Sequence, residues 1–103
     1  MEYTNFTFPK GWMKKLDNMT EWNDHTGRLI EIAKECEKQA GAGSYNQSIF
    51  GSIRKALEDN RREHDRAGHL TETLYTIRWG LALYLQQQIG FTFGPEVLAK
   101  IRP

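Results

Sequence analysis

The sequence predicts an all-α fold, a compact bundle of three main helices with an extended aromatic N-terminal arm and a short C-terminal helix. Apolar residues recur every three or four positions over most of the chain, which is the period of an amphipathic helix. Glycines at 41, 43 and 68 divide this pattern into segments of helical length. With 103 residues and 39% hydrophobic content, the chain can form one modest core, so we expect a single helical domain over residues 1–103.

The first helical segment has two apolar stripes, separated by residues that favour helix starts. The stripes are Trp12, Leu16 and Met19, followed by Leu29, Ile30, Ala33 and Cys36. Thr20, Asn23 and Asp24 are good N-caps, so a break between two helices is predicted near 20–24. One bent helix over residues 12–39 is the alternative. The glycines at 41 and 43 end this segment.

The second main helix is predicted from Ser44 to the region of Gly68. Ser44 and Gln47 have the spacing of a capping box. Its inner positions follow the helical period, at Ile49, Ile53, Ala56 or Leu57, and Asn60. Charged pairs three or four residues apart, such as Arg54 with Glu58, indicate a wet outer side. The basic run at 61–62 is therefore expected to be a solvated helix face rather than a nucleic-acid stripe.

The third main helix is predicted to begin at Thr71-Glu72, after an interruption at Gly68. We expect its core face to be formed by Leu74, Ile77, Leu81, Tyr84 and Leu85. Trp79, Leu83 and Ile89 add apolar surface on other sides. A helix that is apolar nearly all round is typical of a bundle centre or a subunit interface, so we expect a homo-oligomer, most simply a two-fold dimer.

The two ends of the chain share an alternation of aromatic residues and threonine, at 6–8 and 91–93. Such alternation favours extended structure, and a short β-bridge between the termini is one interpretation. The favoured alternative is that both segments are extended arms that pack their aromatic rings onto the bundle. Pro95 suits the first position of a short last helix whose apolar side holds Val97, Leu98 and Ile101.

Composition limits the classes of function. Fourteen basic and thirteen acidic residues give a net charge of +1, so no overall field attracts nucleic acid or an anionic membrane. Cys36 is the single cysteine, which excludes an internal disulfide and fits a reducing compartment. The N-terminal region has no apolar signal core, and the longest apolar run is too short to span a bilayer. A cytoplasmic protein without membrane or nucleic-acid partners is expected.

Two polar segments, at 23–28 and 64–69, contain all three histidines, each segment with an Asp, an Arg and a Gly. We expect them to converge, within one subunit or across two, on a small anion. If Asn23 or Asp24 caps the helix, the free amides of residues 25–27 would form a cradle for a phosphate or carboxylate. The alternative is that Asp24 caps the helix and the histidines bond to backbone carbonyls. The expected ligand-binding residues are His25, Thr26, Arg28, His64, Arg66 and His69.

No catalytic residues and no cofactor are expected. His64 and His69 are five residues apart, so they cannot share one metal ion unless the helix breaks between them, as Gly68 would permit. The His64-Asp65 pair is similar to the dyad of HD-type phosphohydrolases, but that pattern is not completed elsewhere and we reject it. Cys36 lies on an apolar stripe, where a small core residue is favoured over a nucleophile.

The order of these motifs resembles small helical proteins encoded by tailed bacteriophages. The resemblance covers residues 22–86 and rests on Asn-Asp-His opening a helix, a long helix, and then Gly-His-Leu-Thr starting another, with Leu74, Tyr75, Arg78 and Tyr84 downstream. It implies a phage accessory protein, which would act in the host cytoplasm, and it supplies no catalytic residues.

Three functions remain open from the sequence. The first is a non-enzymatic accessory protein that sequesters a small anionic or nucleotide ligand, as a counter-defence protein would. The second is an inhibitor or adaptor that docks on a host protein through its aromatic arms and helix faces. The third is a metal-dependent hydrolase that uses the histidines and Asp65. The absence of a recognised catalytic motif favours the first two.

Overall fold

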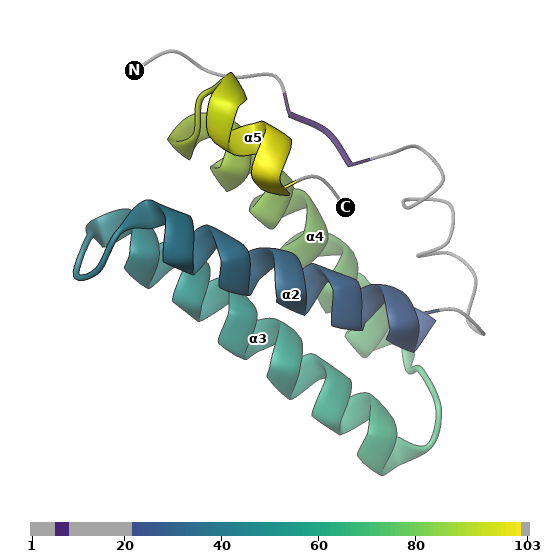
Figure 1. The fold of residues 1–103 in the computed structure, drawn as a ribbon. Helices are drawn as coiled ribbons and strands as arrows, with labels where there is room; N and C mark the ends of the chain where they lie inside the picture. Colours follow the sequence, from purple (N-terminus) through teal and green to yellow (C-terminus); the bar gives the residue numbers. More distant parts are fainter. Residues whose placement is uncertain (1–5, 9–21, 102–103) are drawn as a thin grey trace.

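The all-α class is confirmed. The computed structural model describes residues 6–8 and 22–101, with side chains from residue 26 onward in the second range, and within these residues it contains four helices and no strand. The helices are α2 (Trp22–Ala40), α3 (Tyr45–Ala67), α4 (Glu72–Thr92) and α5 (Pro95–Ile101). Figure 1 shows α2 and α3 side by side and antiparallel, α4 behind them, and α5 near the C-terminal half of α4. The choice between one and two helices over 12–39 falls on residues outside this description.

The two helix starts predicted from hydroxyl residues are confirmed. The Ser44 hydroxyl accepts the N–H of Gln47 at 3.1 Å and caps α3, and the Thr71 hydroxyl accepts the N–H of Leu74 at 3.1 Å and caps α4. The Gln47 side chain does not close the box on Ser44 but accepts the N–H of Gly43 at 2.8 Å. Hydrogen bonds of Gln47 to Gly43 and to Ser44 therefore both hold the turn that precedes α3.

The core lies between α2, α3 and α4. Cys36 is fully buried there, and burial raises the pKa of its thiol to about 12, so its predicted role as a small core residue is confirmed. The apolar side chains that the three helices bury together are Leu29, Ile30, Ile32, Ala33, Cys36, Phe50, Ile53, Leu57, Ala82, Leu85 and Ile89.

The predicted core face of α4 is partly wrong. Ile77 and Tyr84 are 48% and 44% exposed, whereas Leu85 is fully buried. The inward positions of α4 are Arg78, Ala82, Leu85 and Ile89, which follow one another at helical spacing. Leu74 and Leu81 lie at the edge of this face, partly buried against the core. The error arises because apolar residues surround α4, while its inward face includes an arginine.

The aromatic N-terminal segment packs onto the bundle, as the favoured interpretation of residues 6–8 predicts. Phe6 and Phe8 are buried, and their rings meet edge to face at 5.5 Å. The backbone N–H of Phe8 donates to Oε1 of Gln86 at 2.7 Å, which ties this segment to α4.

The aromatic segment near the C-terminus is not an extended arm. Phe91 and Thr92 belong to α4, and only Phe93, at the C-cap, has extended backbone angles. The Phe93 ring is buried and stacks on Phe50 of α3 with 5.5 Å between centroids. Pro95 then starts α5, which buries Leu98 and Ile101, and the predicted last helix is confirmed.

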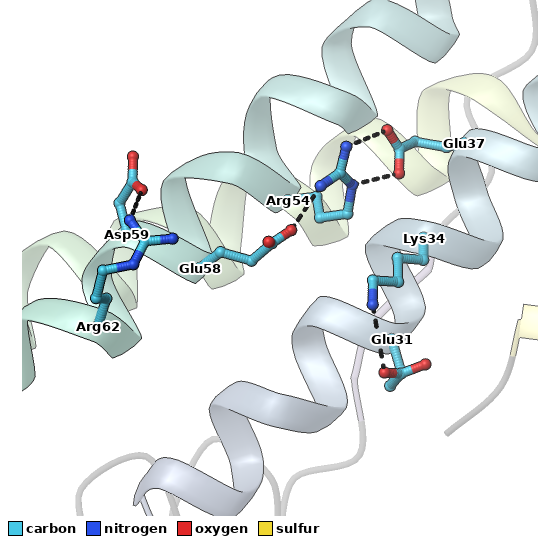
Figure 2. A network of polar contacts seen from close by, with 7 residues as sticks. All are labelled: Glu31, Lys34, Glu37, Arg54, Glu58, Asp59 and Arg62. Carbon is cyan, nitrogen blue, oxygen red and sulfur yellow. Dashed lines mark hydrogen bonds and ion pairs between the residues drawn. The ribbon is translucent and has the colours of Figure 1, made fainter. Parts of the chain in front are cut away.

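Arg54 links α2 to α3 through two carboxylates (Figure 2). Its Nε and Nη2 atoms donate to Glu37 of α2 at 2.6 and 3.2 Å, and its Nη1 atom donates to Glu58, one turn along α3, at 2.6 Å. A Cβ atom at Gly51 would lie 2.8 Å from Oε1 of Glu37, so this glycine leaves room for the carboxylate. A planar guanidinium held by both carboxylates helps fix how α2 and α3 align.

Alanine variants of Leu85 and Leu83 test which side of α4 faces the core. We expect Leu85→Ala to lower the free energy of unfolding by about 2–5 kcal/mol, because this fully buried side chain leaves a cavity. Leu83→Ala, at a position that is 48% exposed, should change it by only about 0.5 kcal/mol. Chemical denaturation of both variants measures the difference, and equal losses would contradict the assignment of the inward face.

Candidate functional site

The two histidine-containing segments lie at the same end of the bundle. Figure 1 shows that α2 begins where α3 ends and where α4 begins. The helix α3 stops at Ala67 because Gly68 has a left-handed conformation (φ 76°) and returns its N–H to the carbonyl of His64 at 3.0 Å. The predicted interruption at Gly68 is confirmed, and it turns His69 out of α3.

This end of the bundle contains a fully buried arginine, Arg78 of α4. Removing a guanidinium from water is unfavourable unless its N–H groups donate to acceptors or an opposite charge lies nearby. Burial lowers the pKa of Arg78 to about 10, the charge of Asp65 opposes that change, and the charge of Arg61 adds to it. Arg78 therefore remains cationic at neutral pH inside the protein.

Asn60 of α3 holds this arginine in place. Its Oδ1 atom accepts the Nε–H of Arg78 at 2.6 Å, and its Nδ2 atom donates to the carbonyl of Leu74 at 3.1 Å. Leu74 and Arg78 are one helical turn apart on α4, so one amide contacts two successive turns. The inner position predicted for Asn60 is confirmed, and its side chain fixes the rotation of α4 relative to α3.

His64 lies directly beside this contact. Its Nδ1 atom is 3.4 Å from Nη2 of Arg78. Because a guanidinium only donates, this contact requires an unprotonated Nδ1 and assigns the imidazole proton to Nε2. Burial, followed by the charge of Arg78, lowers the pKa of His64; the charge of Asp65 opposes this change, and the smaller effect of His69 adds to it. His64 is therefore a neutral acceptor at physiological pH.

Arg61 crosses from α3 to α2. A Cβ atom at Gly27 would lie 3.3 Å from Nη1 of Arg61, so the absence of a side chain there allows the guanidinium to lie against α2. Arg61 is exposed and makes no ion pair with the residues that the structure describes. It lines an open hollow between α2 and α3, together with Gly27, Ile30, Glu31, Lys34, Glu58, Arg62 and Asp65.

The sequence-predicted ligand residues have different surroundings. His64 and His69 are near each other at the end of α3, and Nδ1 of His69 is 3.1 Å from the carbonyl of Ala67. Arg66 is exposed and forms an ion pair with Glu63 at 2.6 Å. Arg28 is exposed on α2. The side chain of His25 lies outside the described part of the structure.

The phosphate cradle predicted around Thr26 is not formed. The helix α2 already begins at Trp22, so Asn23 and Asp24 lie within it rather than at its N-cap. The amides of Thr26 and Gly27 are consequently four or more residues inside the helix, where backbone N–H groups donate to the preceding turn. Thr26 itself is fully buried and presents no hydroxyl to solvent.

Arg61 and Arg78 are the site residues that the sequence analysis did not select. Arg78 is the only charged residue between Thr73 and Thr92, and it shares a helical face with Ala82, Leu85 and Ile89. That isolation in an apolar helix is a signal for a buried arginine. The position of Arg61 depends on Gly27 of another helix, which no local pattern reveals.

Some features are not found in the described part of the chain. Its side chains include no group of three or more His, Cys, Asp or Glu residues that could hold a metal ion. None of its helices combines the length and the apolarity needed to cross a membrane. Comparisons of the chain with protein-family models, with curated proteins and with solved structures find no match.

The lowered pKa of His64 predicts how stability depends on pH. The unfolded chain binds a proton near pH 6.5, more readily than the folded protein does, so this residue reduces stability as pH falls below that value. His64→Gln keeps a hydrogen-bonding side chain but cannot be protonated. We therefore expect thermal unfolding from pH 7.5 to 5 to shift less in this variant than in the wild type. An equal or larger acid shift in the variant would contradict the assigned neutral state.

Proposed function

We propose that this protein is a non-enzymatic binding protein that holds a small anion, of the phosphate or nucleotide class, in the hollow between α2 and α3. The observation that carries this proposal is the gathering of Arg61, His64 and Arg78 at one end of the bundle. Burial is the main cause of the lowered pKa of both Arg78 and His64; the charge of Arg61 adds to the first shift and the charge of Arg78 to the second, while Asp65 opposes both. Of the three, Arg61 lines the hollow, and an anion bound beside it would offset its charge.

Arg61 is the principal contact in this proposal. Its guanidinium borders the hollow and offers several N–H donors in the planar arrangement that suits phosphate oxygens. Gly27 lies close beside it, because a Cβ atom there would stand 3.3 Å from Nη1 of Arg61. Arg28 follows Gly27 on α2 and is exposed.

The other charges around the hollow are largely matched. Glu58 forms an ion pair with Arg54, and Arg62 forms one with Asp59 (Figure 2). Arg61 has no such partner among the described residues, so its charge is available to a ligand. Asp65 lines the same hollow and would disfavour anions that approach from its side.

Sequestration, without chemical conversion, is the activity that we propose. The only thiol, Cys36, is buried and its raised pKa keeps it protonated, so it supplies no nucleophile. His64 is held next to a guanidinium, which disfavours its protonated form and its action as a general acid. A protein of this kind would act by removing an anionic ligand from solution, as expected of a phage accessory protein that counters a host defence.

Two alanine variants on α3 test the role of Arg61. We expect Arg61→Ala to weaken anion binding about tenfold or more, because it removes charge-assisted hydrogen bonds. Lys55→Ala removes the same charge from an exposed site on the same helix and should leave binding unchanged. Calorimetric titration with inorganic pyrophosphate and with adenosine and guanosine mono- and diphosphates measures both, while circular dichroism verifies the fold.

Two outcomes would contradict this function. One is the absence of measurable binding of any of these anions to the wild-type protein. The other is an equal loss in Arg61→Ala and Lys55→Ala, which would indicate attraction by overall charge rather than a site. Either result would favour the second function, an inhibitor or adaptor that docks on a host protein.

A further inference from the structure

The solvent-facing side of α4 carries no charge along most of its length. We define the outer face of α4 as Ile77, Gly80, Leu83, Tyr84, Gln87 and Phe91, all of which are exposed. The one charged residue between Thr73 and Thr92 is Arg78, and it points inward. The exposed side of α3, by contrast, holds Lys55, Asp59, Arg61, Arg62, Glu63, Asp65 and Arg66. An apolar, uncharged stripe of this kind is typical of a surface that another surface covers.

Gly80 is a second, independent feature of the outer face. A glycine inside a helix is less favourable than an alanine, because it increases the entropy lost on folding. A Cβ atom at Gly80 would meet no other atom within 4 Å, so no contact with the described residues requires a glycine there. A glycine does allow a second helix backbone to approach closely. Gly80 is thus suited to be a crossing point between two helices.

We propose that the outer face of α4 is the interface with a second copy of this chain, whose α4 packs antiparallel across Gly80. Ile77 precedes Gly80 by three residues and Tyr84 follows it by four, on the same side of the helix. A two-fold axis near Gly80 would therefore place Ile77 of each copy against Tyr84 of the other. The contact is self-complementary, as a two-fold dimer requires.

Charge favours a second copy as the occupant. Pairing two identical faces brings like charges together wherever the face is charged, and here it has none. The net charge of +1 adds little repulsion between whole molecules. Gln87 and the hydroxyl of Tyr84 provide polar atoms for hydrogen bonds in such an interface. The outer face of α4 is thus the interface that we propose for the homo-oligomer expected from the sequence.

The size of the outer face of α4 determines how strongly two copies of the chain should associate. With Ile77 opposite Tyr84, the paired stretch of each α4 runs from Leu74 to Gln87 and rises about 20 Å, at roughly 1.5 Å per residue. A hollow between α3 and α4, lined by Tyr45, Ile49 and Tyr84, adjoins this face and adds apolar surface from α3. The contact lies at the low end of stable interfaces, so dimerisation should depend on protein concentration in the micromolar range. None of these residues belongs to the anion site, so each proposal can fail separately.

Sedimentation velocity over protein concentrations from about 5 to 500 µM tests this proposal, a range chosen for an interface of low-end size. We expect the wild type to move from the 12.0 kDa monomer towards twice that mass. Tyr84→Lys should raise the dissociation constant at least about tenfold, because it buries a charge in the interface. Gly80→Gln should also weaken the dimer, because it blocks close approach without adding charge. Both positions are exposed, and circular dichroism verifies that the fold is retained.

Ala99→Lys is the matched control, since it adds the same charge at an exposed position on α5. It should associate as the wild type does. The proposal is overturned if the wild type stays monomeric throughout this range, if Tyr84→Lys and Gly80→Gln associate as strongly as the wild type, or if Ala99→Lys weakens association as much as Tyr84→Lys.

Discussion

The buried contact between Asn60 and Arg78 is the constraint on which the arrangement of α4 depends. A guanidinium is unfavourable in an apolar core unless its N–H groups donate to acceptors. Oδ1 of Asn60 accepts the Nε–H of the buried Arg78 at 2.6 Å. The same amide also donates to the carbonyl of Leu74, so it fixes two turns of α4 at once. A different rotation of α4 would break both bonds and leave a buried charge without this partner.

This rotation has two consequences on opposite sides of the helix. Inward, it aligns Ala82 and Leu85 with the core and brings Arg78 next to His64 and near the charges of Asp65 and Arg61. Outward, it exposes the side that contains Gly80 and Tyr84, since successive residues turn by roughly 100°. One polar contact in the core thus determines which side of α4 faces the core and which side faces solvent.

Features that depend on residues close together in the sequence could be predicted from it. Ser44, Thr71 and Pro95 begin helices as expected, and Gly68 ends one, because each acts through its own backbone conformation or a bond within one turn. The candidate site was harder to predict, because Arg61 lies against Gly27, which belongs to another helix.

The inward side of α4 could not be predicted for a related reason. Apolar residues surround this helix, so periodicity alone does not distinguish its sides. The contact that does distinguish them joins residues 18 positions apart.

Hydrogen exchange of the Arg78 Nε–H, followed by ¹⁵N NMR at mildly alkaline pH, tests most directly the claim that the contact with Asn60 holds Arg78 in the core. We predict that this proton exchanges slowly, that Asn60→Ala removes its protection, and that the exposed Asp59→Ala does not. Exchange in the wild type as fast as that of the exposed Arg62 would contradict the account.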